Sequence, residues 1–365
     1  MSLSFLGGRV EERTYGIALI GAGVIAPVHT EAIGAIPRAR LVAVCDVVRE
    51  KADALAAKWG AEAAYDYHDL LERPDIDIFE VVVWSGRHAE IGIEAARAGK
   101  HVIVTKPIDV TLEAIDALIA ACDENKVKLA AVHQFRSYPS YLAAHQAVAE
   151  GRLGKMVLGN AIVPWYRPQS YYDGDEWRGT WRWDGGGALM NQSVHYVDLL
   201  QWIMGGVSEV MAYADIAAHH ERIEVEDVAV AALRFRDGAI GCLEGSTSVY
   251  KGLPARLDIH AEKGNILIVG DKIAHWDVEG LPAPDAAGVG VEPRVSPTGA
   301  SDPRGALAGP AVAAHIAQIS DVLDAIEHNR PPKLDGREAR KAVEVNLAIY
   351  RSARERRPVA LPLGR

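Results

Sequence analysis

A histidine that follows a run of glycines has the clearest capacity for acid–base chemistry. Residues 184–198 read Asp-Gly-Gly-Gly-Ala-Leu-Met-Asn-Gln-Ser-Val-His-Tyr-Val-Asp, and the apolar spacing after the glycines predicts an amphipathic helix. Asn191 and His195 stand four residues apart, so they share one face of that helix. Histidine can take a proton from an alcohol under oxidation or return it to a ketone. A lone helical histidine is usually structural, but the glycines and the polar partner favour catalysis.

A lysine supplies a second reactive group, in Thr105-Lys106-Pro107. It directly follows the apolar run 101–104, which is predicted to be a strand. Ligands of open parallel sheets bind beyond the carboxyl ends of the strands, which places Lys106 beside the nicotinamide end of a dinucleotide. The alternative is a surface lysine in a turn.

A dinucleotide is indicated by Gly-Ala-Gly-Val-Ile-Ala at 21–26, between a predicted strand and a predicted helix. The first glycine permits a tight turn, the second lets the backbone approach a pyrophosphate, and the final alanine lets the helix pack on the strand. The helix N-terminus offers amide donors to the phosphates. The expected contacts are Gly21, Gly23, Val24 and Ile25.

An acidic residue at the end of the second predicted strand indicates whether the dinucleotide is NAD or NADP. Asp46 lies about 20 residues beyond the glycine motif, where a carboxylate accepts hydrogen bonds from the adenosine ribose. Its charge would repel a 2′-phosphate, so NAD is expected over NADP. Arg49 is expected to contact the cofactor nearby, and its positive charge softens that preference.

These residues need a scaffold, and the first third of the chain predicts one. Continuous apolar runs alternate with helical spacing, which is typical of a parallel sheet covered on both faces. The predicted strands are 16–20, 41–45, 78–84, 101–104 and 127–132, and the predicted helices are 25–36, 49–59, 88–98 and 111–122. We therefore predict an α/β Rossmann domain over residues 14–135, after a flexible leader at 1–13.

The pattern changes after residue 135. Strand-like runs become longer and alternating, and Arg-Asp-Gly at 236–238 and Glu-Lys-Gly at 262–264 are hairpin signals. Residues 136–365 are thus predicted to form a second α/β domain, an antiparallel sheet with helices to one side. Its predicted helices are 140–149, 311–328 and 337–356, with a long loop at 280–310.

Composition narrows the class of protein. A net charge of −10 argues against a nucleic-acid partner, and no apolar run is long enough to cross a membrane. The leader lacks a signal-peptide core, so we expect a cytoplasmic protein. The three cysteines, Cys45, Cys122 and Cys242, are widely spaced and predict neither a disulfide nor a metal site.

Together these motifs resemble the glucose–fructose oxidoreductase / inositol dehydrogenase / rhizopine catabolism (Gfo/Idh/MocA) family over residues 15–362. Further markers are Gly-Lys-His-Val-Ile-Val-Thr-Lys-Pro at 99–107 and Gly-Arg-Leu-Gly-Lys at 151–155. The resemblance implies a Rossmann domain followed by a large open sheet that often forms the oligomer interface, hence a homodimer or homotetramer. It implies reversible hydride transfer at a ring carbon of a sugar, nucleotide sugar or inositol.

The resemblance also implies roles for single residues. Lys106 would contact the substrate hydroxyl and the nicotinamide, and His195 would be the proton donor or acceptor. Two positions depart from the family pattern. Thr105 replaces the usual Glu, and Asn191 stands where many members carry Asp. Asn191 can orient a hydroxyl or His195 but cannot accept a proton, which shifts acid–base chemistry to His195, with Lys106 assisting.

An aromatic and basic segment is expected to line the substrate pocket together with Asn191 and His195. Sugars stack on aromatic rings and hydrogen-bond through their hydroxyls, while arginines can pair with a carboxylate or phosphate. The residues concerned are Tyr166, Arg167, Tyr172, Trp177 and Arg178. A subunit interface is the alternative, since it favours the same residue types.

Further residues and rival functions complete the expectations. His133 is interpreted as structural, His315 as closing over the substrate, and Arg136 as lining the nicotinamide side or joining the domains. Two other functions remain open: an NAD-dependent glycosidase with no net redox change, and a non-catalytic sugar or NAD sensor.

Overall fold

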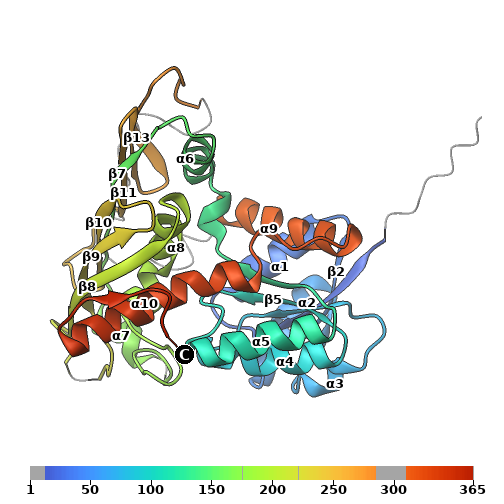
Figure 1. Cartoon of the computed structure of the whole chain (residues 1–365). Coiled ribbons are helices and arrows are strands. Elements are labelled where there is room, and N and C mark those ends of the chain that lie inside the picture. The colour runs from blue at the N-terminus through green and yellow to red at the C-terminus, as the bar shows by residue number, and fades with distance from the viewer. Residues whose placement is uncertain (1–12, 175, 221, 285–309, 365) are drawn as a thin grey trace, which may run out of the picture.

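The computed structural model describes residues 13–174, 176–220, 222–284 and 310–364. The predicted leader and most of the predicted loop at 280–310 lie outside these residues. The described residues form two sheets that lie side by side, with helix α10 (Gly336–Glu355) running along both halves of the molecule (Figure 1).

The N-terminal half is a Rossmann domain with six parallel strands in the order β3-β2-β1-β4-β5-β6. The strands are β1 (Tyr15–Ile20), β2 (Ala39–Cys45), β3 (Glu62–Ala64), β4 (Ile78–Val81), β5 (His101–Thr105) and β6 (Leu129–Val132). The helices are α1 (Ala26–Ala35), α2 (Arg49–Trp59), α3 (His68–Leu71), α4 (His88–Arg97) and α5 (Leu112–Glu124). The predicted fold is confirmed, although β3 and α3 were not predicted.

Local chemistry explains where these helices begin and end. Thr111 accepts a hydrogen bond from the backbone N–H of Ala114 and caps α5, as its position before the apolar run predicts. Gly60 ends α2 in the left-handed conformation, at φ +65°.

Both faces of the parallel sheet are covered, and the C-terminal part of the chain supplies one of the covers. Ile17, Ile78 and Ile103 point to the face where α1 packs against α9 (Pro310–Glu327). Burying each such side chain contributes about 1.5–3 kcal/mol. Helix α9 therefore belongs to the core of the dinucleotide domain, although it follows the second sheet in the chain.

The C-terminal half is built on an eight-stranded sheet in the order β13-β12-β11-β7-β10-β9-β8-β14. Only the β7–β10 pair is parallel among these strand pairs, so the predicted mostly antiparallel sheet is confirmed. The strands are β7 (Met156–Pro164), β8 (Val207–Asp215), β9 (Val228–Phe235), β10 (Ile240–Ser246), β11 (Arg256–Ala261), β12 (Gly264–Val269), β13 (Lys272–Val278) and β14 (Val359–Ala360).

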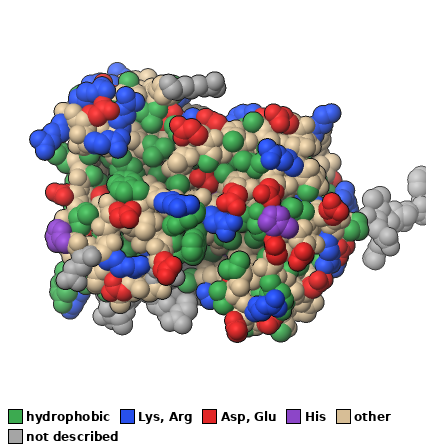
Figure 2. Space-filling model, turned by 90° about the horizontal axis from the view of Figure 1, so that it is seen from below, with side chains coloured by type: hydrophobic (Ala, Val, Ile, Leu, Met, Phe, Trp, Pro, Cys, Tyr) green, Lys and Arg blue, Asp and Glu red, His purple; other side chains and the backbone are tan. Residues whose placement is uncertain are grey.

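Helices cover one face of this sheet and leave the other open. Helices α6 (Pro139–Ala149), α8 (Val194–Ile203) and α10 pack on the covered face, and the short α7 (Gln169–Asp173) lies in the segment after β7. On the open face Tyr213 is 73% exposed and Ile240 is 52% exposed. On the side seen in Figure 2, basic and acidic side chains are interspersed, so its charge is mixed.

Candidate active site

The cofactor loop links β1 to α1, and its two glycines have different surroundings. Gly21 adopts φ +109°, and a Cβ there would lie 2.8 Å from the carbonyl oxygen of Val82. At Gly23 a Cβ would meet nothing within 4 Å, which leaves open space beside the backbone. Helix α1 begins at the fully buried Ala26, and Val24 is half exposed. This geometry fits a pyrophosphate cradle.

The carboxylate of Asp46 is held beside this loop by two backbone donors. The N–H of Ala22 donates to Oδ2 at 2.7 Å and that of Val48 donates to Oδ1 at 2.8 Å. Each oxygen keeps a lone pair for a ribose hydroxyl. The Arg49 guanidinium instead lies 3.9 Å from the ring centre of Tyr65. The residues present thus fit an NAD adenosine.

Lys106 emerges directly after β5 and reaches the C-terminal half. Its Nζ donates to the backbone carbonyl of Asn191 at 2.5 Å. Burial, with the Arg167 and Arg178 charges, lowers the pKa of Lys106 to about 8 against the opposing effect of Asp184. The ammonium is therefore held in surroundings that disfavour its charge.

Asp184 is a site residue that the sequence interpretation did not single out. Its Oδ1 accepts from Asn191 Nδ2 at 2.6 Å and its Oδ2 from the backbone N–H of Gly179 at 2.9 Å. Burial raises the pKa of Asp184 to about 7, against the opposing effects of these hydrogen bonds and of Lys106. The sequence signal that could have identified Asp184 is its position directly before the glycine run.

The glycine run is required by packing. A Cβ on Gly186 would lie 2.1 Å from the Tyr350 hydroxyl, and one on Gly187 would lie 1.8 Å from the Glu226 carbonyl oxygen. The chain then forms a π-helical turn over Ala188–Ser193, and α8 begins only at Val194. The prediction of one uniform helix is thus wrong for its first turn. The glycines that precede this turn allow the chain to pack where side chains would clash. Such turns are frequent at functional sites.

His195 lies in the first turn of α8 and is 7% exposed. Its ring stacks on Phe135 at 4.4 Å, and its Nδ1 is buried with no hydrogen-bond partner in residues 13–174, 176–220, 222–284 and 310–364. Burial lowers the pKa of His195 well below its usual value, and Lys106, His133 and His315 act in the same direction. The imidazole is therefore neutral near pH 7. Asn191 does not orient His195 through Nδ1, because its amide donates to Asp184.

The aromatic and basic segment contributes two arginines beside Lys106. Arg167 donates to Gln192 Oε1 at 2.5 Å, and Gln192 in turn donates to the Tyr171 hydroxyl at 2.9 Å. The Arg178 guanidinium lies 4.4 Å from the Tyr171 ring centre and 5.2 Å from that of Trp177. Gln192 and Tyr171 were not predicted as site residues.

The other two predicted pocket aromatics lie differently. Tyr166 is partly buried and meets Tyr250 edge-on at 6.1 Å. Tyr172 is 2% exposed, packs with Ile223, and its hydroxyl lies 2.8 Å from that of Thr247. The neighbouring Tyr171 presents its hydroxyl to Gln192 where Tyr172 was expected to face a ligand.

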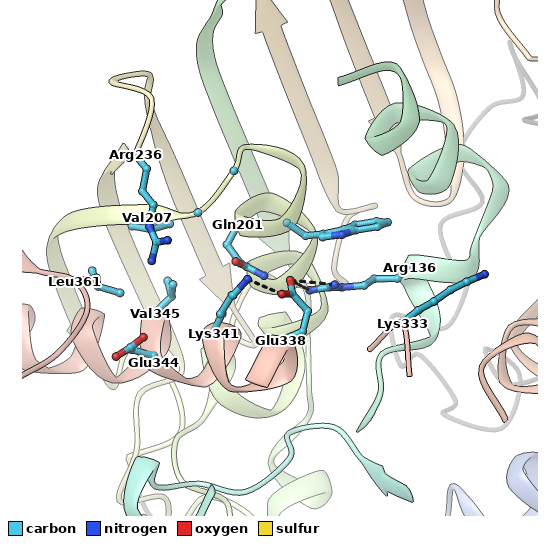
Figure 3. Close-up of a pocket in the computed structure, with 13 residues that line it drawn as sticks. Arg136, Gln201, Val207, Arg236, Lys333, Glu338, Lys341, Glu344, Val345 and Leu361 are labelled. Atoms are coloured by element: carbon cyan, nitrogen blue, oxygen red, sulfur yellow. Dashed lines mark hydrogen bonds and ion pairs between the residues drawn. The ribbon is translucent and has the colours of Figure 1, made fainter. Parts of the chain in front are cut away.

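Two further residues named from the sequence, Arg136 and His315, are both buried. His315 lies in α9, edge-on to His29 at 4.6 Å, and its closure over a substrate stays a prediction. Arg136 lies at the border of a cavity of about 370 Å³ between α8 and α10, together with Gln201, Trp202 and Lys341. Glu338 stands between Arg136 and Lys341 in this cavity (Figure 3).

Among the residues that the structure describes, no helix is long and apolar enough to cross a membrane. Among them, no group of three or more His, Cys, Asp or Glu could hold a metal ion.

Comparisons with known proteins identify the family of both halves of the chain. Residues 15–133 match the model described as "Oxidoreductase family, NAD-binding Rossmann fold", and residues 141–267 match the GFO/IDH/MocA C-terminal domain. The myo-inositol 2-dehydrogenase of Thermotoga maritima is 30% identical over 68% of this chain and 74% of its own length.

Two solved structures are similar over nearly the whole chain. The WlbA dehydrogenase of Bordetella pertussis, in complex with NADH and UDP-GlcNAcA, is 34% identical, with a TM-score of 0.86 over 97% of this chain and 99% of its own. The WlbA dehydrogenase of Chromobacterium violaceum, with the same two ligands, is also 34% identical, with a TM-score of 0.84 over 98% of each chain. The chain therefore belongs to the Gfo/Idh/MocA family of oxidoreductases and carries its NAD-binding Rossmann domain.

Proposed function

We propose that this protein is an NAD-dependent dehydrogenase that oxidises a ring hydroxyl of a nucleotide sugar bearing a carboxylate. When bound, NAD supplies the hydride acceptor. The observation that carries the proposal is the convergence of Lys106, Arg167 and Arg178 beside the buried His195. Burial lowers the pKa of Lys106, and the two arginine charges act in the same direction. Three cations in one water-poor site favour an anionic substrate.

The protein groups divide the chemistry between them. Neutral His195 takes the hydroxyl proton at Nε2, because Nδ1 is buried. Lys106 donates a hydrogen bond to the same substrate oxygen and stabilises the negative charge that develops there. In the reverse direction His195 returns the proton to the carbonyl oxygen as the hydride arrives.

The substrate class rests on charge and on relatives. Arg167 and Arg178 flank Tyr171, which offers both a ring for stacking and guanidinium groups for an anion. The two WlbA structures hold UDP-GlcNAcA, a nucleotide sugar, and they share 34% of their residues with this chain. A carboxylated nucleotide sugar is therefore favoured over an inositol or a neutral sugar.

We also propose that the open face of the second sheet joins copies of the chain into a homodimer or homotetramer. This proposal is supported by the exposed Tyr213, Val230 and Ile240 on that face. Light scattering of the purified protein would give the assembly, and Tyr213→Glu should shift it towards the monomer.

The deciding experiment offers NAD and a panel of substrates to the purified protein and follows reduced nicotinamide by absorbance. UDP-GlcNAcA should give the fastest rise, UDP-GlcNAc should give a weaker one, and myo-inositol little. Faster turnover of myo-inositol would refute the substrate class. Cleavage of a glycoside without net NADH would replace the dehydrogenase with a glycosidase.

A further inference from the structure

A buried polar cluster that the proposed mechanism does not use adjoins His195. His133 follows β6, is 1% exposed, and has no hydrogen-bond partner among the described residues on either ring nitrogen. Its Nδ1 lies 3.4 Å from Oδ2 of Asp198, which stands on α8 one turn beyond His195. The rings of His133 and His195 meet edge-on, with centroids 6.2 Å apart.

Asp198 is anchored from the opposite side. Arg136 donates to both carboxylate oxygens, at 2.7 Å from Nε and 2.6 Å from Nη2. Burial alone would raise the pKa of Asp198, but the Arg136 and His133 interactions outweigh it and lower that pKa below its usual range. The carboxylate therefore stays ionised and fixed.

Within the part of the chain that the structure describes, the other groups that act on the charge of His195 are basic side chains. Lys106 faces it from the end of β5, His315 from α9 and His133 from the end of β6, and all three disfavour a second positive charge. Phe135 covers one face of the ring. An imidazolium formed during oxidation would therefore gain from a hydrogen-bond acceptor that is backed by Asp198.

We propose that His133, backed by Asp198, is a positioning residue for His195. Neutral His133 directs Nδ1–H towards Asp198, which leaves its Nε2 lone pair to accept a hydrogen bond from Nδ1–H of His195. That bond keeps the proton of His195 on Nδ1 and leaves Nε2 ready for the hydroxyl proton. The inference rests on the proposed role of His195.

The proposed hydrogen bond requires the rings of His133 and His195, whose centroids are 6.2 Å apart, to approach each other. Among the described residues neither ring nitrogen of His133 has a hydrogen-bond partner, and neither does Nδ1 of His195, so the two rings share no hydrogen bond in this structure. Catalytic hydrogen bonds are often long without substrate and tighten in the loaded complex. The balance of the step is unchanged: the hydride leaves the carbon, the hydroxyl proton passes to His195 Nε2, and the proton on Nδ1 stays there, shared with His133.

If His133 had a different role, its removal would change the pKa of His195 in the opposite direction. If His133 were only a like-charged neighbour, its removal would raise the pKa of His195. If it accepts a hydrogen bond from His195, its removal destabilises the imidazolium and lowers that pKa. The two roles can therefore be separated without any substrate.

The experiment measures hydrogen–deuterium exchange at the imidazole carbon of His195 by mass spectrometry across pH. His133→Phe removes the acceptor, His133→Gln restores one, and His260→Phe is the control, because His260 lies on β11 with its Nδ1 2.8 Å from Asn265 Oδ1. The pKa of His195 should fall by about one unit in the Phe variant, the equivalent of one charge-assisted hydrogen bond. It should stay near wild type in the Gln and control variants. An unchanged or raised pKa in the Phe variant overturns the proposal.

Kinetics with NAD and UDP-GlcNAcA give a second reading. His133→Phe should lower kcat at least about tenfold, with KM and the Kd for NAD within about twofold. Partial recovery in His133→Gln supports positioning, while equal losses in both argue for a packing role and against it. His133→Leu takes the place of the Phe variant if that variant fails to bind NAD. Loss of turnover in His195→Ala with wild-type behaviour of His133→Phe would reject this inference and leave the proposed function standing.

Discussion

The two ends of the site are built in different ways. At the cofactor end the recognising groups come from short contiguous segments, and backbone N–H groups of Ala22 and Val48 hold Asp46. At the substrate end Lys106, Asp184 and His195 come from distant segments, are largely buried, and have shifted pKa values.

The difference has a physical consequence. The half-buried Asp46 keeps contact with solvent, so changes there should alter affinity by modest factors. The groups of the substrate end interact in a low-dielectric interior, where each charge depends on its neighbours. Substitutions there should have larger effects and should depend on pH.

The largest effect is expected from removal of the histidine. His195→Ala should lower kcat at least about 10²-fold, the range of general acid–base catalysis, because no other neutral base adjoins Lys106 in the proposed mechanism. The Kd for NAD should stay near that of the wild type. Steady-state kinetics and a fluorescence titration with NADH would measure both. Wild-type turnover in this variant would remove His195 from the mechanism.

A smaller effect is expected from an arginine. Arg178→Ala should raise KM for UDP-GlcNAcA roughly 10- to 100-fold, the equivalent of one charge-assisted hydrogen bond, with a much smaller change for UDP-GlcNAc. Arg152→Ala is the matched control, since Arg152 is exposed and pairs only with Glu150 among the described residues. Equal losses for both sugars would assign Arg178 to the diphosphate and not to the carboxylate.

The same contrast explains what the sequence could predict. The Rossmann strands and the loop at Gly21 follow from neighbours in the chain, because continuous apolar runs and glycine spacing are local signals. Strand β13 (Lys272–Val278) was missed because charged and aromatic residues interrupt its alternation. Predicted helices at 311–328 and 337–356 lie within one or two residues of α9 and α10.

The substrate end was predicted only in part. Lys106 and His195 were named, yet the hydrogen bonds of Asn191 to Lys106 and Asp184 depend on how the two halves meet. The spacing of apolar residues does not predict that α9 packs on α1 or that Arg136 donates hydrogen bonds to Asp198. Such contacts join segments far apart in the chain, and one sequence carries no signal for them.

The strain at the substrate end should also be visible in stability. Burial lowers the folded-state pKa of Lys106 to about 8 from an ordinary 10.5, so below pH 8 the folded protein carries a disfavoured charge. Lys106→Met should therefore raise the free energy of unfolding at pH 7 by about 1–3 kcal/mol. As pH rises from 8 to 10.5 the folded wild type releases this proton first and gains stability, so the advantage of Met shrinks. Urea titrations of the wild type and of Lys106→Met at pH 7 and at pH 10.5 would measure the difference in the free energy of unfolding. The same difference at both pH values would contradict the burial argument.

The smallest effect is expected at the cofactor end. Asp46→Ser removes the carboxylate but keeps a hydroxyl, so affinity for NAD should fall roughly tenfold, the equivalent of one charge-assisted hydrogen bond. NADP should bind better, because the charge that repels its 2′-phosphate is gone. Asp53→Ser is the control, since Asp53 lies on α2, beyond Asp46, and its Oδ1 accepts from the Tyr65 hydroxyl at 2.8 Å. Titration of each variant with both cofactors would measure the preference. If Asp46→Ser left it unchanged, Asp46 would not contact the ribose. If kcat fell as far as in His195→Ala, the two ends of the site would not be separable.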